Sequence, residues 1–221
     1  MKAVVSIIMG STSDWPVMQK AAKFLNDMEI PFEVNALSAH RTPEQVEAYA
    51  AKATKEGVKV IIAGAGGAAH LPGVMAAFTP LPIIGVPCRS SISIDGWDSI
   101  LSILQMPPGI PVATVGLDGA HNAAILAVQM IATGDAAVME KLVAVLQLLL
   151  ALILAVAVIS TLVNMVLIAT RPETISVVNA IIGQGVLIVC LAALAKVIGG
   201  KGWRTLKGAP QDAQKNAGEA D

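Results

Sequence analysis

Three short segments hold most of the side chains in this sequence that could take part in chemistry. They read MGSTSD (9–14), SAHRTPE (38–44) and AGAGGAAHLPG (63–73), and each follows an apolar run of strand length. Between them they carry hydroxyl, carboxylate, imidazole and guanidinium groups. These groups favour two kinds of chemistry, which are the binding of an anion and proton transfer near neutral pH.

The first segment combines a glycine turn with small polar side chains. Gly10 allows a close turn, Ser11 and Ser13 offer hydroxyls, and Asp14 stands where a helix of about 14–28 would begin. A helix N-terminus after such a turn suits a phosphate, and Asp14 could hold a ribose hydroxyl. The alternative is equally open: a strand, a turn and a helix that Asp14 merely caps.

The second segment places His40 and Arg41 side by side before a helix that begins at Pro43. The guanidinium of Arg41 fits a phosphate in charge and shape. The imidazole of His40 could move a proton near neutral pH. The alternative is a solvated surface pair, although the loop lies at the end of a strand, where α/β proteins form their sites.

The third segment is rich in glycine. Gly64, Gly66 and Gly67 surround Ala65, so the backbone could approach a flat ligand closely. The segment lacks the GK[ST] of a phosphate-binding P-loop and is not a convincing GxGxxG, so a nucleotide cofactor is not predicted. His70, in the first turn of the next helix, is as consistent with a structural role as with a catalytic one.

Several other functions find no support in the sequence. A net charge of −1 gives no reason to expect nucleic acid as a partner. Cys88 and Cys190 fit no metal or redox spacing, and with three scattered histidines a metal site is not expected. His121 is predicted to have a structural role or to lie at the surface. The GxSxG motif that carries the nucleophilic serine of a Ser–His–Asp site does not occur in the sequence.

The first 141 residues alternate between strand-like and helix-like patterns. Apolar strands separated by helices predict a parallel sheet covered on both faces, with a site at the carboxyl ends of the strands. Thr42 as N-cap, Pro43 as first residue and Gly57 as terminator define one helix well. The expected strands are 3–9, 31–39, 58–66, 81–87 and 111–116, and the expected helices are 14–28, 42–57, 70–78, 98–106 and 121–132.

The C-terminal part has a different composition. Hydrophobic residues make up 55% of the chain and charged residues 14%, against about 25% in ordinary soluble domains. The residues MEKL (139–142) look like the end of a soluble helix, yet 142–170 contains no charge, and neither does 174–195. As a helix the first run is about 43 Å long. The run is longer than the roughly 20 residues that a helix needs to cross a bilayer.

These two runs, joined by RPET (171–174), predict a transmembrane hairpin. The predicted domains are 1–141, an α/β domain; 142–200, the hairpin; and 201–221, a polar and disordered tail. Residues 142–198 would contact membrane lipid or detergent. Lysines and arginines flank the outer ends of the hairpin, which places both termini in the cytoplasm; they are Lys141, Lys196, Lys201, Arg204 and Lys207.

Two alternatives to the membrane remain open for this tail. The helices could be buried between the subunits of a large oligomer, although more than 20 residues without polar alternation argue against it. The tail could also be foreign, as in an engineered fusion that begins near MEKL.

The three segments, taken in this order, resemble the PurE family of purine biosynthesis, the N5-carboxyaminoimidazole ribonucleotide mutases. The likeness covers residues 4 to about 134. The glycine-rich segment resembles that of the mutases more than that of the enzymes that carboxylate aminoimidazole ribonucleotide with free carbon dioxide. The matching stretches are MGSTSDW, SAHRTPE, VIIAGAGGAAHLPGVMAA, IGVP, DSILSILQMPPGIPVATV and HNAAILA.

The resemblance implies a flavodoxin-like three-layer fold, a homo-octamer and an isomerase that moves a carboxyl group from N5 to C4 of the imidazole without a cofactor. His40 would be the general acid and base. The residues implied to bind the substrate are Ser11, Asp14, Ser38, Arg41, Ala65, Gly66, Gly67 and His70. Family members often read VQS where this chain reads CRS (88–90), so Arg89 is expected to alter the rim of the site.

The function predicted from the sequence is therefore that of a cytoplasmic mutase domain with a membrane-inserting hairpin. The alternative is an oligomeric scaffold or a membrane-protein fusion, in which the α/β domain serves assembly rather than catalysis.

Overall fold

The computed structural model describes residues 2–170. The RPET turn, the second apolar run and the polar tail lie outside the described residues, so the hairpin as a whole is not tested. Five strands form the sheet, namely β1 (Val5–Met9), β2 (Phe32–Ala36), β3 (Val60–Gly66), β4 (Ile83–Cys88) and β5 (Ala113–Thr114). The helices are the short η1 (Thr12–Asp14), α1 (Trp15–Asp27), α2 (Pro43–Glu56), α3 (Leu71–Phe78), α4 (Trp97–Leu104), α5 (Ala120–Ala132) and α6 (Ala136–Thr170).

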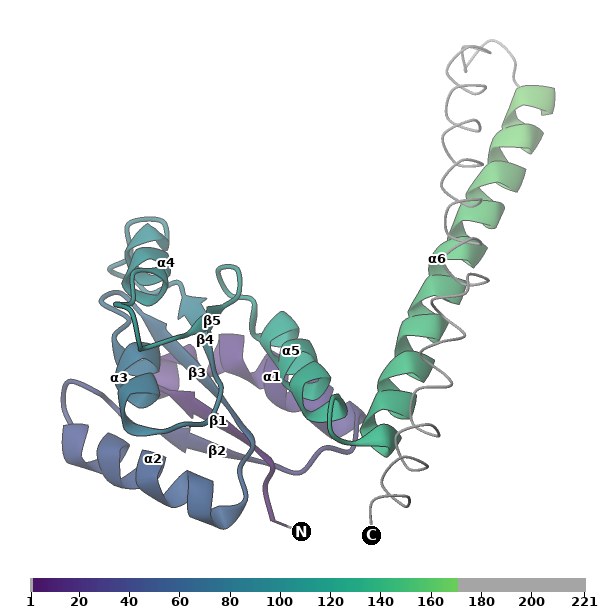
Figure 1. Ribbon diagram of the computed structural model, residues 1–221. Coiled ribbons are helices and arrows are strands. Elements are labelled where there is room, and N and C mark those ends of the chain that lie inside the picture. Colours follow the sequence, from purple (N-terminus) through teal and green to yellow (C-terminus); the bar gives the residue numbers. More distant parts are fainter. Residues whose placement is uncertain (1, 171–221) are drawn as a thin grey trace, which may run out of the picture. The chain divides into compact units, whose positions relative to one another are not determined.

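The sheet has the strand order β2-β1-β3-β4-β5, and all of its pairings are parallel (Figure 1). This is the flavodoxin-like arrangement that the sequence resemblance implied. Each predicted strand and helix of the first 141 residues is present. The carboxyl ends of β1, β2 and β3 therefore meet at one edge of the sheet. The segments 9–14, 38–44 and 63–73, which carry the candidate site residues, lie at this edge.

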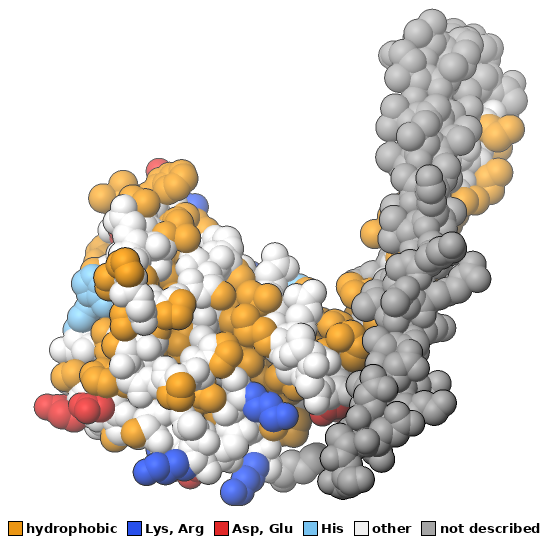
Figure 2. Space-filling view, in the orientation of Figure 1, with side chains coloured by type: hydrophobic (Ala, Val, Ile, Leu, Met, Phe, Trp, Pro, Cys, Tyr) orange, Lys and Arg blue, Asp and Glu red, His pale blue; other side chains and the backbone are white. Residues whose placement is uncertain are grey.

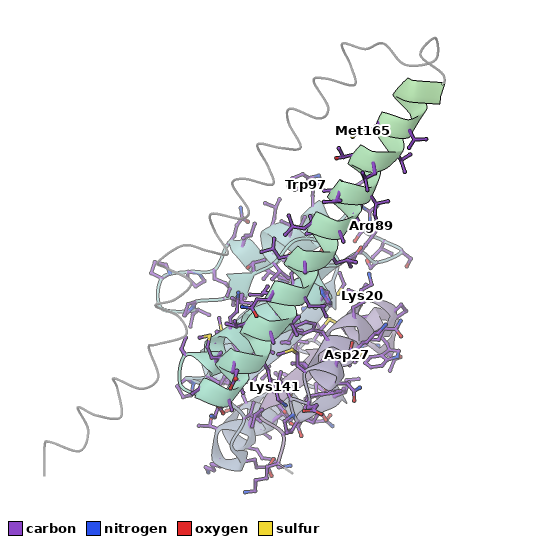
Figure 3. The ribbon with its side chains drawn as sticks, turned by 90° about the vertical axis from the view of Figure 1, so that its right-hand side faces the viewer. Lys20, Asp27, Arg89, Trp97, Lys141 and Met165 are labelled. Carbon is purple, nitrogen blue, oxygen red and sulfur yellow. The ribbon has the colours of Figure 1, made fainter. Side chains whose placement is uncertain are left out.

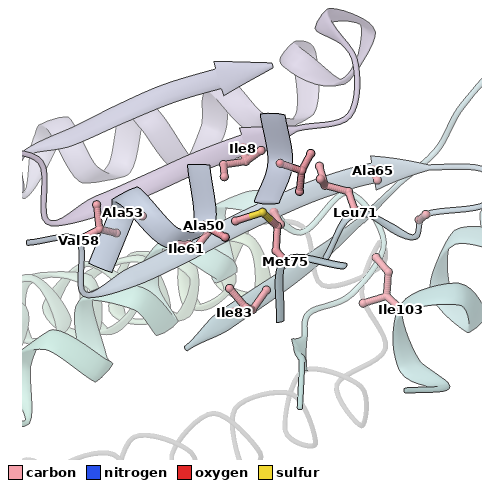
Figure 4. Packing of buried hydrophobic residues seen from close by; sticks show 13 residues of the cluster. Ile8, Ala50, Ala53, Val58, Ile61, Ala65, Leu71, Met75, Ile83 and Ile103 are labelled. Carbon is pink, nitrogen blue, oxygen red and sulfur yellow. The ribbon is translucent and has the colours of Figure 1, made fainter. Parts of the chain in front are cut away.

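Alternate residues of the central strands face opposite layers. Ile8, Ile61 and Ile83 join a buried cluster with Ala50 of α2 and Met75 of α3 (Figure 4). The neighbouring positions Ile7, Ile62 and Ile84 are equally buried. The sheet is buried on both faces because helices cover both of them, which explains why its strands read as continuous apolar runs.

Local signals in the sequence set the ends of α2. Thr42 is its N-cap residue, Pro43 its first residue, and Gly57 ends it in the left-handed conformation with φ of 96°. The Thr42 hydroxyl donates to the Ser38 carbonyl oxygen at 3.1 Å rather than capping the helix. This contact folds the loop before α2 back on itself and fixes the position of His40 and Arg41 within it.

Strand β5 is shorter than predicted. The expected strand was 111–116, but only Ala113 and Thr114 pair with β4. Pro111 has no backbone N–H to donate, and the pairing with β4 ends at Thr114. The prediction of the strand was correct in place and wrong in length.

Helix α6 corrects the prediction that a soluble helix ends at MEKL. The Asp135 carboxylate caps α6 by accepting from the backbone N–H groups of Ala137 and Val138, and the helix continues without a break to Thr170. Leu142 is 4% exposed, and the ammonium of Lys141 pairs with the Glu29 carboxylate at 2.5 Å (Figure 3). Residues 136–142 are therefore packed as part of the α/β domain.

The chain divides into two compact units, Met1–Leu142 and a second unit that starts at Val143. Within the described residues, Ala136–Val166 is the one helix long and apolar enough to cross a membrane, judged by length and composition alone. The side chains of α6 beyond Leu142 are mostly exposed. From Gln147 to Thr161 the partly buried ones recur at alternating spacings of three and four residues. These include Gln147, Leu150, Leu154, Ala157 and Thr161.

Candidate active site

The three segments predicted from the sequence surround one cavity of ≈ 300 Å³ at the carboxyl edge of the sheet. Ser90, Ser91 and Ile92, from the loop after β4, complete its wall. Histidine side chains gather at the surface beside α3 (Figure 2). Eight of the nine predicted site residues line the cavity, namely Ser11, Asp14, Ser38, His40, Arg41, Ala65, Gly66 and His70.

Ser11 and Asp14 form a reciprocal capping box at η1. The Ser11 hydroxyl accepts from the Ser13 N–H at 3.2 Å, and the Asp14 carboxylate accepts from the Ser11 N–H at 3.2 Å. Asp14 occupies the N-cap position of α1, as the alternative reading of the sequence allowed, but its side chain makes no capping hydrogen bond to that helix. The hydrogen bonds between Ser11 and Asp14 cap η1, the short helix that precedes α1.

Asp14 is buried, with 8% of the residue exposed. Burial raises its pKa above the usual value, and the backbone hydrogen bond from Ser11 only partly opposes this shift. A carboxylate held in so dry a position is suited to accept a hydrogen bond from a ligand hydroxyl, because water competes weakly for it.

Ser38 organises the second segment. Its hydroxyl accepts from the backbone N–H of Arg41 at 3.2 Å and from Arg41 Nε at 3.4 Å. The Arg41 side chain is thus held at its Nε, while the described structure gives the outer guanidinium nitrogens no partner in the protein. An exposed guanidinium fixed in this way at a cavity wall is arranged to bind an anion in a bidentate manner.

His40 and His70 are in direct contact across the cavity mouth. His40 Nε2 lies 2.8 Å from His70 Nδ1, and the two rings meet edge to face with centroids 5.0 Å apart. His70 occupies the N-cap position of α3, one residue before the first turn in which it was predicted. The structure thus brings together two histidines that are 30 residues apart in sequence.

The glycine-rich segment packs tightly against the end of β4. Gly66 pairs with Cys88 in the sheet, and a Cβ at Gly66 would lie 2.9 Å from the Cys88 carbonyl oxygen. Gly67 has φ of +61° and lies beneath the Ile92 side chain. It is the predicted site residue that does not line the cavity. Glycine is thus required at position 66, because the backbones of β3 and β4 approach each other closely there.

Sequence reasoning missed Ser90, Ser91 and Ile92, which line the cavity from the loop after β4. It singled out Arg89, which does not line the cavity: its side chain pairs with Asp95 at 3.7 Å, and its backbone N–H donates to the Asp118 carboxylate at 2.9 Å. Ser90 and Ile92, the next residues along, form the rim instead. Their place after a central parallel strand was a signal that could have identified them.

His121 lies away from this cavity. Its ring meets the Phe24 ring edge to face at 5.0 Å, beside Lys20 and Asp27 of α1 (Figure 3). This placement agrees with the structural or superficial role predicted for it. Within residues 2–170, three or more His, Cys, Asp or Glu side chains nowhere gather in a way that could hold a metal ion.

The cavity therefore offers an anion-binding cation, a desolvated carboxylate and hydroxyls on one side, and paired imidazoles on another. Between them lie Ala65 and Gly66, whose small size leaves room for a flat ring. Such an arrangement can hold a phosphorylated sugar that carries a planar base, and it can move a proton at that base.

Comparison with known proteins agrees with this geometry. The family model of AIR carboxylase matches residues 4–148, past the boundary predicted after Lys141. The N5-carboxyaminoimidazole ribonucleotide mutase of Pyrococcus abyssi is 59% identical over 138 residues, which are 62% of this chain and 79% of that protein.

Two further likenesses extend the comparison. The phosphoribosylaminoimidazole carboxylase of Saccharomyces cerevisiae is 56% identical over 141 residues, which are 64% of this chain and 24% of the yeast protein. The crystal structure of Treponema denticola PurE superposes with a TM-score of 0.59 at 30% identity, over 65% of this chain and 89% of that one.

Proposed function

The chain belongs to the AIR carboxylase family, and on that premise we propose that it is an isomerase that converts N5-carboxyaminoimidazole ribonucleotide to 4-carboxyaminoimidazole ribonucleotide. The observation that carries the proposal is the convergence of Asp14, Arg41 and His40 on one cavity. The mutases from Pyrococcus abyssi and Mycobacterium tuberculosis, at 59% and 56% identity, support it.

Each group around the cavity has a task in this reaction. Arg41, with the Ser11 and Ser38 hydroxyls nearby, binds the ribose phosphate. Asp14 accepts a hydrogen bond from a ribose hydroxyl. Ala65, Gly66 and His70 surround the base and the migrating carboxyl. These assignments come from the family resemblance, and the arrangement of the residues around the cavity supports them.

The reaction proceeds by decarboxylation and recarboxylation within the site. The N5–carboxyl bond breaks, N5 receives a proton, and carbon dioxide stays in the cavity. C4 then attacks the carbon dioxide, and the hydrogen at C4 leaves as a proton. His40 gives the first proton and takes the second, so it ends in its starting state and the reaction consumes no external acid or base.

The test is the substitution His40→Asn. Loss of a general acid and base costs about 10²- to 10⁴-fold in rate, so kcat should fall by that factor while KM changes little. Turnover of N5-carboxyaminoimidazole ribonucleotide measures both. The control is His121→Asn, which changes a histidine of α5 outside the cavity and should leave both constants unchanged. Full activity of His40→Asn would contradict the assignment.

Carboxylation of aminoimidazole ribonucleotide by free carbon dioxide is the second candidate. The yeast relatives that share 56% and 58% identity are named phosphoribosylaminoimidazole carboxylases, and this name supports the second candidate. The two activities are separated by supplying either N5-carboxyaminoimidazole ribonucleotide, or aminoimidazole ribonucleotide with bicarbonate. The mutase turns over the first substrate in a buffer free of bicarbonate.

We further propose that the domain assembles as a homo-octamer. Large apolar side chains are exposed on and before α4, and Ile92, Trp97 and Leu104 are 82%, 61% and 58% exposed. Such a patch on one side of a domain is typical of a protein interface. The family resemblance supplies the number of subunits, and the patch supports self-association.

For residues 142–200 we propose a membrane-inserted helical hairpin that anchors a cytoplasmic enzyme, with both termini in the cytoplasm and a polar tail after residue 200. The apolar length of α6 supports the first span. The partly buried residues from Gln147 to Thr161, spaced alternately by three and four, form the kind of stripe along which one helix packs against another.

A further inference from the structure

The loops that follow β4 and β5 are joined at Asp118, a residue of the second loop. Its carboxylate accepts a hydrogen bond from the backbone N–H of Arg89 at 2.9 Å. Its own backbone N–H donates to the carbonyl oxygen of Pro87 at 2.8 Å. Pro87 belongs to β4, and Arg89 is the first residue after that strand. Asp118 thus holds the place at which the first loop leaves the sheet.

Asp118 adopts a backbone conformation in which glycine would be less strained. Its φ is 55°, and only two other non-glycine residues of the described chain have a positive φ. Aspartate tolerates the left-handed region better than most residues, but glycine meets no steric cost there. Such a conformation persists only where the surroundings hold it, and it is found frequently at functional sites. What a glycine would lack at this position is the carboxylate that binds the Arg89 N–H.

Arg89 leads directly into the wall of the candidate active site. Ser90, the next residue, lines the cavity, and its backbone N–H donates to the Ser93 hydroxyl at 3.1 Å. The Ser93 N–H donates in return to the Ser90 carbonyl oxygen at 3.1 Å. A Cβ added to Gly66 would lie 3.0 Å from Ser90 Cβ. The position of Ser90 therefore sets the gap between this loop and the glycine-rich segment.

The Arg89 side chain contributes less to fixing the loop. Its guanidinium lies 3.7 Å from the Asp95 carboxylate, and the two side chains are 56% and 87% exposed. Exposed ion pairs of this kind are weak, because water and salt screen them. A second contact between the loops is apolar: the Leu117 side chain covers Gly96, where an added Cβ would lie 2.5 Å from it. The loop after β4 is thus tied to the residues around Asp118 at both of its ends.

We propose that Asp118 is a positioning residue for the candidate active site. It acts through the backbone of Arg89 and holds Ser90 at the distance from Gly66 that the bound substrate requires. Asp118 does not itself line the cavity. That the substrate is the imidazole ribonucleotide rests on the proposed mutase function, whereas the hold of Asp118 on the loop does not.

A looser wall should weaken substrate binding more than it slows the chemical step. In the proposed reaction the protons pass through His40, and Ser90 neither gives nor takes one. Contacts with the wall are made alike by the substrate and by the transition state, so their loss raises KM and leaves kcat nearly unchanged. Partial unfolding has the opposite signature, because it lowers the apparent kcat at constant KM.

Two substitutions separate the acceptor from its charge. Asp118→Asn removes the charge but keeps an oxygen that can accept from the Arg89 N–H, so KM should stay within about twofold of the wild type. Asp118→Gly removes the acceptor and suits the left-handed conformation, so Tm should not fall while KM rises about threefold or more. In both variants kcat should change by less than about twofold. Thermal unfolding and steady-state turnover of the full chain measure these quantities.

The control is Glu29→Gly. Glu29 has the same φ of 55°, but it follows α1 at an exposed position outside the cavity. Its replacement by glycine should leave KM unchanged. A wild-type KM in Asp118→Gly would overturn the inference. Equal increases of KM in Asp118→Gly and Asp118→Asn would overturn it as well, because they would assign the effect to the charge rather than to the hydrogen bond.

Hydrogen exchange tests the hold on the loop without reference to activity. In the full chain in detergent, the Arg89 amide should exchange about tenfold faster or more in Asp118→Gly, because a hydrogen bond to a charged acceptor is lost. In Asp118→Asn the rate should stay closer to that of the wild type. Mass spectrometry with fragmentation to single amides measures these rates. An unchanged rate at Arg89 in Asp118→Gly would contradict the proposal.

The two proposals fail separately. If the Arg89 amide responds as expected but the wild-type protein does not turn over N5-carboxyaminoimidazole ribonucleotide, the mutase function is wrong and the hold of Asp118 on the loop stands. If the wild-type protein is active and the amide exchanges at the same rate in all variants, the function stands and the positioning role of Asp118 is wrong.

Discussion

The carboxyl group of Asp14 lies in the candidate site at a cost to the stability of the fold. Burial raises its pKa above 3.8 in the folded protein. Between 3.8 and the raised value the folded state binds more protons than the unfolded state. The free energy of unfolding contributed by Asp14 therefore falls as the pH rises through that interval, and the loss persists at higher pH.

Replacement of Asp14 by Asn should separate stability from binding. The amide oxygen can still accept from the Ser11 N–H, but no charge has to be desolvated, so Tm at pH 7 should equal or exceed that of the wild type. KM should rise about tenfold or more, because a hydrogen bond to a charged group contributes roughly 1.5–3 kcal/mol. Thermal unfolding and steady-state kinetics measure the two effects.

The matched control is Asp27→Asn at the end of α1, at an exposed position outside the cavity. It should change neither Tm nor KM appreciably. A lowered Tm with an unchanged KM in Asp14→Asn would show that Asp14 is only a structural cap.

Cys88 lies next to the cavity but should be chemically inert. Its side chain is 0% exposed, and burial, together with the Asp14 and Asp118 carboxylates, raises the pKa of the thiol to about 12. Since the thiolate is the reactive form, iodoacetamide at pH 8 should alkylate Cys88 only after unfolding. Peptide mass spectrometry of native and denatured samples tests this, and rapid labelling of the native protein would contradict it.

At the scale of elements, the junction of β3 and β4 limits what the cavity wall can tolerate. A Cβ at Gly66 would lie 2.9 Å from the Cys88 carbonyl oxygen and 3.0 Å from Ser90 Cβ. Gly66→Ala should therefore push β4 and the Ser90 loop away. Overpacking of this kind costs about 1–3 kcal/mol, which corresponds to a Tm lower by about 3–9 °C.

Gly134→Ala is the control for that substitution, because a Cβ there meets nothing within 4 Å. Its Tm should match the wild type. Since Ser90 and Ile92 line the cavity, KM should rise in Gly66→Ala as well, and a variant with wild-type Tm and KM would show that the wall is more compliant than the packing indicates.

Much of the element pattern was predictable because it depends on short-range signals. Thr42, Pro43 and Gly57 specify α2 locally, and apolar runs between helices specify a buried parallel sheet. The convergence of the three segments then follows from topology, since parallel strands end at the same edge. The short β5 departs from its pattern because Pro111 cannot contribute a ladder hydrogen bond.

What the sequence did not predict depends on contacts between distant residues. The pairing of His40 with His70 requires the loops after β2 and β3 to be placed within a few tenths of an ångström, and no local pattern carries that information. Ser90 and Ile92 were not predicted, because the charged residue beside them, Arg89, was expected to form the rim of the site. Its charge is directed to Asp95 instead.

At the scale of the whole molecule, the two compact units should be separable. The family match ends at residue 148, and Leu142 is the last buried residue of the first unit. A protein truncated after residue 148 should stay monodisperse without detergent and keep the activity of the full chain. The full chain should need detergent to remain in solution, because two spans would otherwise meet water.

Light scattering coupled to size-exclusion chromatography, with and without detergent, measures both proteins. A further truncation after Gly134 removes Leu142 and the Lys141–Glu29 ion pair, so it should lower Tm. If the full chain is monodisperse in the absence of detergent, the membrane hairpin is wrong, and the helices are instead buried within an assembly.

The two-residue β5 also protects the protein from aggregation. It is one of the two edges of the sheet, and an exposed edge strand is a template to which another chain can add by backbone pairing. Ala113 and Thr114 offer too short a ladder for that, and the Pro-Pro-Gly-Ile-Pro segment before them lacks N–H groups at its prolines. On this side, contacts between molecules must therefore form through side chains, and a growing cross-β stack cannot begin there.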